Sequence, residues 1–151
     1  MIGQFPDVLD SSMMASFKSC PELFRKVYIE QWKPRGLSVH LHAGASFAKG
    51  LEVARKAFYP EADALPGDNK SAEEAEAEGM QALLTAYGSF DCPADSAKSA
   101  ERMAGAYEFY FSNYPLASDE CSPITLPGGK RGIEFSFTHP LSLLHPTSGN
   151  P

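Results

Sequence analysis

Residues 39–58 read VHLHAGASFAKGLEVARKAF, and this stretch decides the fold prediction. Its apolar residues recur at the spacing of one face of an α-helix, at Ala43, Phe47, Leu51, Ala54 and Phe58. We therefore expect a long helix over residues 39–58, with Phe47 and Leu51 buried in the core. Tyr59 precedes a proline, which disfavours helical geometry, and should end this helix.

Helices are also predicted on both sides of this stretch. Ser71 with Glu74 three residues later forms a capping box, which opens a helix over residues 71–88. Asp95 or Ser96 is expected to cap a further helix over residues 96–114. Towards the N-terminus, we expect a short helix that ends at Ser19, capped by Ser11 or Ser12, and a second one from Pro21 to Ile29.

The pattern changes after Pro115. Residues 122–126 and 132–138 are separated by the turn-forming stretch 127–131, which is typical of a β-hairpin. Within 132–138, apolar and polar residues alternate, as in a half-buried strand. The predicted fold class is therefore α+β, with helices dominating and an incomplete β-sheet at the C-terminal end.

Length and composition restrict the class of protein. The 151 residues fit a single domain, and 43% hydrophobic residues are enough to build a core. The formal charge of −6 argues against a generally cationic surface, so any contact with nucleic acid needs a local patch. No apolar run approaches the roughly 20 residues of a membrane span, and no secretory signal is visible. Three widely spaced cysteines suggest neither a disulfide framework nor a zinc site, so we expect a cytoplasmic location.

Few residues suggest chemistry by themselves. Glu134 lies on the polar side of the predicted strand, and Glu52 projects from the long helix. Either carboxylate could help to hold a divalent cation, because such cations take oxygen ligands, although residues at such positions are more often simply exposed on the surface. His40 and His42 would diverge on a helix, and no phosphate-binding glycine loop is present.

Three segments, taken in order, carry a resemblance to a known family. Residues 12–24 contain Cys-Pro-x-x-Phe after a short helix, residues 41–52 begin a glycine-led helix, and residues 132–137 form a strand that is followed by the turn 145–151. Together they resemble the N-terminal portion of a phage-type, RecB-like PD-(D/E)XK nuclease. The resemblance implies a restriction-endonuclease-like fold, of which residues 1–151 would be a truncated, helix-rich portion of one domain.

This resemblance implies a metal-dependent DNA nuclease, active in phage DNA recombination, repair or processing in the host cytoplasm. The complete enzyme would use Mg²⁺ or Mn²⁺, with Glu134 as a catalytic residue and with Glu134 and Glu52 as metal ligands. Its partners would be DNA and recombination or replication proteins, with no membrane. The candidate DNA-binding residues are Lys33, Arg35, Lys49, Arg55, Lys56, Lys130 and Arg131.

The sequence also departs from the family pattern. The family's catalytic Gly-x-x-Asp and Glu/Asp-x-Lys would follow the last residue, Pro151, so we expect the 151-residue chain itself to be inactive. Ala48 stands where many relatives have a metal-binding histidine, and only Cys20 matches the cysteines of iron–sulfur relatives, so no such cluster is expected. Two alternatives stay open: a non-catalytic DNA- or protein-binding module derived from such a nuclease, and a helical domain unrelated to nucleases.

Overall fold

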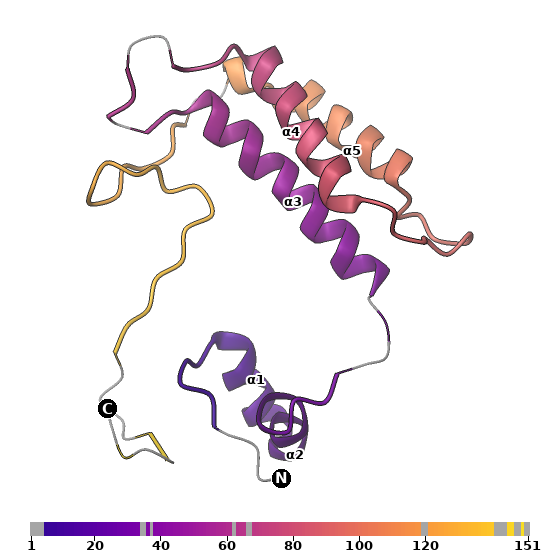
Figure 1. The fold of residues 1–151 in the computed structure, drawn as a ribbon, viewed down its shortest axis with the longest axis vertical. Helices are drawn as coiled ribbons and strands as arrows, with labels where there is room; N and C mark the ends of the chain where they lie inside the picture. The colour runs from indigo at the N-terminus through magenta and orange to yellow at the C-terminus, as the bar shows by residue number, and fades with distance from the viewer. Residues whose placement is uncertain are drawn as a thin grey trace. The chain divides into compact units, whose positions relative to one another are not determined.

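The computed structural model describes residues 5–33, 36, 38–61, 63–65, 68–118, 121–140, 145–146 and 149. The chain divides into two compact units, which are treated separately below (Figure 1). The larger unit comprises residues 37–136, and the smaller unit combines residues 1–36 with residues 137–151. That all 151 residues form one nuclease domain stays a prediction.

Three helices that alternate in direction make up most of the larger unit (Figure 1). They are α3 (Val39–Phe58), α4 (Ala72–Tyr87) and α5 (Ala100–Asn113), followed by the 3₁₀ turn η2 (Leu116–Ser118). The predicted bounds of α3 are confirmed, as is the capping box at the start of α4, where Ser71 and Glu74 bond reciprocally. The prediction for α5 was wrong about the cap, because Ser99 accepts the bond from the helix amide and the helix starts at Ala100.

Helices α3 and α4 approach each other most closely where two glycines meet. A Cβ atom added to Gly50 would lie 3.0 Å from the carbonyl oxygen of Gly79, and one added to Gly79 would lie 2.6 Å from that of Gly50. Contacts this short leave no room for any side chain at either position. Tyr107 of α5 closes the same region, since its ring is 2% exposed and its hydroxyl donates to the Glu76 carbonyl at 3.0 Å.

The buried face of α3 matches the predicted one only at Ala43 and Ala54. The fully buried positions are small residues, namely Ala43, Ser46, Gly50 and Ala54. Phe47 and Leu51, which we expected in the core, are half-buried and pack against the edge of the core cluster. The positions of the large apolar residues were a poor guide to the buried face of α3. Two helices that approach closely need small side chains at their contact, and the larger side chains then lie at its edge.

The α+β prediction is wrong for the part of the chain that the structure describes, which contains helices and no β-strand. The expected hairpin over residues 122–138 is reduced to a turn with one isolated bridge, between Thr125 and Arg131. Pro123 has no amide to continue the ladder on one side, and Glu134 has a φ of 47°, which is outside strand geometry, on the other. A pairing this short does not propagate into a sheet.

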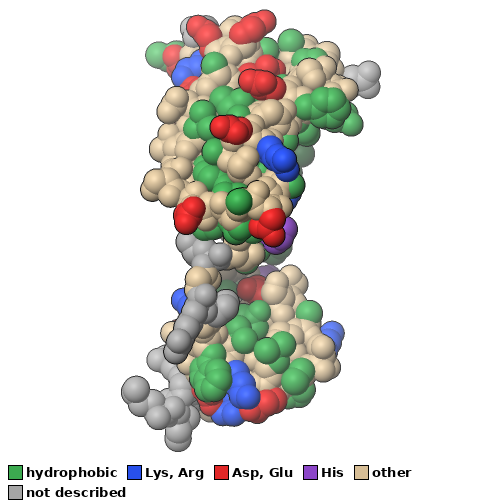
Figure 2. Space-filling model, turned by 90° about the vertical axis from the view of Figure 1, so that its right-hand side faces the viewer, with side chains coloured by type: hydrophobic (Ala, Val, Ile, Leu, Met, Phe, Trp, Pro, Cys, Tyr) green, Lys and Arg blue, Asp and Glu red, His purple; other side chains and the backbone are tan. Residues whose placement is uncertain are grey.

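The smaller unit contains α1 (Ser11–Ser19), the short helix α2 (Pro21–Phe24) and the π-helical turn η1 (Arg25–Ile29). Asp10, rather than a serine, caps α1 by accepting from the Met13 amide at 2.8 Å. The core of the smaller unit is built around Phe24, which is 5% exposed. Its ring contacts the rings of Phe5, Phe17 and Tyr28. Beside this cluster lies an apolar hollow of about 280 Å³. Figure 2 shows hydrophobic side chains exposed on the surface of the protein.

Within the described ranges, no helix has both the length and the apolar character that are needed to cross a bilayer.

Candidate functional site

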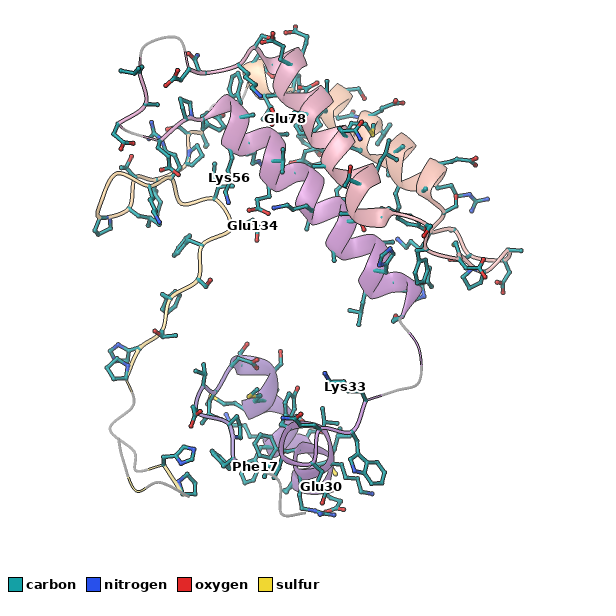
Figure 3. All side chains as sticks on the ribbon, viewed as in Figure 1. Phe17, Glu30, Lys33, Lys56, Glu78 and Glu134 are labelled. Atoms are coloured by element: carbon teal, nitrogen blue, oxygen red, sulfur yellow. The ribbon has the colours of Figure 1, made fainter. Side chains whose placement is uncertain are left out.

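Three of the four candidate site residues on α3, namely Lys49, Glu52 and Lys56, line a hollow beside this helix. It has a volume of about 360 Å³. We call it the charged hollow; its lining residues are Lys49, Glu52, Val53, Lys56, Ala57, Pro60, Asp68, Lys70 and Glu78. Figure 3 labels Lys56 on α3 and Glu78 on α4. The close contact of Gly50 with Gly79 sets the separation of α3 and α4, the two helices that supply most of this lining.

Glu52 is at the centre of the ion pairs on α3. Its carboxylate accepts from the Lys49 ammonium at 3.0 Å and from the Lys56 ammonium at 2.5 Å. The three residues lie at helical spacings of three and four, so they share one face of α3. The hydrogen bond from Lys56, followed by the one from Lys49, lowers the pKa of Glu52. Glu52 is therefore a carboxylate kept ionised between two cations.

A second ion pair comes from the start of α4. The ammonium of Lys70 pairs with the carboxylate of Glu78. The position of Lys70 is fixed by its neighbours, because its amide donates to the Ala57 carbonyl of α3 at 3.3 Å and the next residue, Ser71, caps α4. Three lysines thus converge on the charged hollow from two separate segments of the chain.

The other predicted DNA-binding residues lie elsewhere. Arg55 donates to the Tyr110 hydroxyl at 2.8 Å and so links α3 to α5. Lys130 is exposed in the turn that precedes Arg131. Lys33 is exposed in the smaller unit, and Arg35 lies outside the described residues. Only Lys49 and Lys56 of the predicted set therefore belong to the charged hollow.

Arg131 has a structural role in the larger unit. Its guanidinium donates to the Pro60 carbonyl at 3.0 Å and to the Thr125 hydroxyl at 2.8 Å. Its amide donates to the carboxylate of Glu61 at 2.8 Å. Arg131 therefore ties the 125–131 turn to the segment that follows α3.

Glu134 is exposed on a loop of the larger unit, where its φ of 47° places the backbone in the left-handed region (Figure 3). Among the residues that the structure describes, no three His, Cys, Asp or Glu side chains come together in a way that could hold a metal ion. Glu52 already accepts from two ammonium groups. The described residues thus do not fit a Mg²⁺ site, and we assign no step of hydrolysis to them; the metal-binding roles of Glu134 and Glu52 in a complete enzyme stay predictions.

His42 has a structural role as well. Its ring stacks on Phe90 with centroids 4.2 Å apart, and its Nε2 donates to the Tyr87 carbonyl at 2.9 Å. These contacts fasten the start of α3 to the end of α4.

Sequence reasoning missed Lys70, Glu78 and Asp68 as members of the charged hollow. The sequence carries one relevant signal, and it concerns Lys70 alone. Lys70 directly precedes the capping box and must therefore lie at the start of α4. That this start meets the outer face of α3 depends on how the 61–70 connection folds.

No protein-family model matches this chain, and searches of curated proteins and of solved structures found no similar protein.

Proposed function

We propose that this chain is the DNA-contacting, N-terminal part of a metal-dependent nuclease of the RecB-like PD-(D/E)XK class. The observation that carries the proposal is the charged hollow, where Lys49 and Lys56 of α3 are joined by Lys70. Ammonium groups on one rigid surface are the usual contacts to backbone phosphates, and they bind without regard to base sequence. The ordered resemblance of the three sequence segments supplies the nuclease class.

The helical platform supports this assignment by its rigidity. The close contact at Gly50 and Gly79 leaves α3 and α4 little freedom to move against each other. Lys49 and Lys56 lie about two helical turns apart on one face of α3, so both can contact the same DNA backbone. In this proposal the larger unit positions DNA, and hydrolysis needs the acidic residues and the lysine that the family places on its strands.

Binding of DNA tests the proposal directly. We suggest measuring the affinity of a short, fluorescein-labelled linear duplex by anisotropy over a range of salt concentrations, in the presence of EDTA. The Lys49→Gln/Lys56→Gln variant should bind more weakly, and the slope of log K against log salt should fall by about 2, because each lost phosphate contact removes close to one unit.

A matched variant controls for the change in net charge. Lys18→Gln/Arg102→Gln removes the same two charges from exposed positions outside the charged hollow. It should keep most of the affinity and the salt slope. Equal losses in both variants, or no measurable binding by the unmodified chain at low salt, would contradict the proposal. Duplex and single-stranded probes separate a nuclease-like preference from a general module that binds polyanions.

A further inference from the structure

Glu52 is placed where it competes with nucleic acid for the lysines beside it. We propose that its carboxylate is an internal mimic of phosphate, which keeps Lys49 and Lys56 occupied until a phosphodiester group displaces it. This inference rests on the proposed function, because it presumes that the two lysines contact DNA. It assigns to the charged hollow a built-in restraint on DNA affinity.

The geometry puts Glu52 between the two cations rather than beside one. It lies three residues after Lys49 and four before Lys56, and each of its carboxylate oxygens accepts from a different ammonium. Its side chain is 19% exposed, whereas those of Lys49 and Lys56 are 51% and 48% exposed. The lysines can therefore turn towards an incoming phosphate while the carboxylate stays against the helix.

Charge balance shows why displacement is needed. The charged hollow contains three lysines and three carboxylates, the latter from Glu52, Asp68 and Glu78. With every ion pair made, its net charge is zero, so it offers a phosphate little attraction from a distance. A phosphate gains strong contacts only when it replaces a carboxylate as the acceptor from an ammonium group.

Glu52 should matter more than the other two acidic residues. Glu78 pairs with one lysine, Lys70, whereas Glu52 holds two. Asp68 is engaged in its own loop, where its carboxylate accepts from the Leu65 amide at 2.8 Å. The hydrogen bonds from Lys56 and Lys49 lower the pKa of Glu52, so the ionised carboxylate is the form that a competing anion has to displace.

The test is the DNA affinity of Glu52→Gln, measured by anisotropy with the same labelled duplex and with EDTA present. EDTA removes any contribution of Glu52 as a metal ligand. We expect the variant to bind about threefold to tenfold more tightly at low salt, because no carboxylate has to be displaced from the two lysines. Its salt slope should be at least as steep as that of the unmodified chain, since the same two lysines contact phosphates in both complexes. Inorganic phosphate should compete with DNA more effectively in the variant than in the unmodified chain.

Two further variants make the result decisive. Glu108→Gln removes one negative charge from an exposed position on α5 and should leave the affinity nearly unchanged. Adding Lys49→Gln/Lys56→Gln to Glu52→Gln should abolish the gain. The inference is overturned if Glu52→Gln binds no more tightly than the unmodified chain, or if Glu108→Gln gains as much. Failure of the lysine variants to weaken DNA binding would instead overturn the proposed function itself.

Discussion

The hydroxyl group of Tyr107 occupies the space that a side chain at position 79 would need. A Cβ atom on Gly79 would lie 2.0 Å from that hydroxyl oxygen. The same hydroxyl donates to the Glu76 carbonyl one turn earlier on α4. A large residue of α5 and a glycine of α4 thus form one packing unit, which positions α4 against α3.

The first prediction follows from this contact. Gly79→Ala should lower the free energy of unfolding by about 1–3 kcal/mol, because the added methyl group overpacks a fixed backbone contact. The control is Gly105→Ala on α5, where a Cβ atom would meet nothing within 4 Å. That substitution should stabilise the protein by up to about 1 kcal/mol through helix propensity. Urea denaturation of both variants measures the free energies of unfolding. An unchanged free energy for Gly79→Ala would show that α3 and α4 can move apart at little energetic cost.

The second prediction compares two core positions. Leu83 is fully buried, with 0% exposure, whereas Phe47 is half-buried at the rim. Leu83→Ala should cost about 2–5 kcal/mol, since it leaves a cavity that the glycine contacts cannot close. Phe47→Ala should cost less than Leu83→Ala, in spite of its larger side chain. Thermal or urea unfolding measures both losses of stability. A larger loss for Phe47→Ala than for Leu83→Ala would support the buried face of α3 that the sequence pattern predicted.

The third prediction concerns alkaline pH. Burial raises the pKa of Tyr107, whereas an unfolded tyrosine titrates near pH 10, at about its ordinary value. Above that pH the unfolded chain loses a proton that the folded chain keeps, so the free energy of unfolding should fall as the pH rises. Tyr107→Phe should be less stable at neutral pH but should show a shallower decline above pH 10. Tyr114→Phe, at a site that is 67% exposed, should leave the decline unchanged.

The fourth prediction is that residues 1–151 alone do not cleave DNA with Mg²⁺ or Mn²⁺. Mg²⁺ requires an octahedral set of oxygen ligands, and the oxygens of Glu52 already accept from Lys49 and Lys56. The assay measures nucleotides released from linear duplex and single-stranded DNA, with and without chelator. Chelator-sensitive cleavage that disappears in Glu134→Ala would contradict the prediction and would place a complete site within these residues. If the proposed function is right, a longer chain that includes a Gly-x-x-Asp and a Glu/Asp-x-Lys should cleave.

Local signals in the sequence predicted the helices, although the caps of α1 and α5 are other residues than those expected. The bounds of α3 and the capping box of Ser71 and Glu74 depend on interactions within a few residues, so both could be predicted. The absence of the hairpin could not be predicted. Alternation of apolar and polar residues over 132–138 is typical of a strand, but a strand also needs a paired neighbour, and the backbone at Glu134 is outside strand geometry.

The candidate site was predictable to a similar extent. Lys49, Glu52 and Lys56 share a helix face by their spacing. Sequence reasoning named the two lysines as DNA contacts and Glu52 as a metal ligand, but it did not predict that they pair. Lys70 was missed because it joins them only through the packing of α4 on α3. The burial of Ser46 and Gly50 on α3 was missed for the same reason: it depends on the packing of α4 on α3. A hydropathy pattern does not show how closely two glycines can approach.

The connection between α3 and α4 is fastened where it returns to the helices. The amide of Lys70 donates to the carbonyl of Ala57, so the two ends of the intervening stretch are held together independently of what lies between them. The entropy of closing a loop grows only slowly with its length. A peptide tag or a fluorophore-bearing insert after Asp63 should therefore be accommodated without moving Lys70, which makes this connection a practical attachment point for reporters of events at the charged hollow.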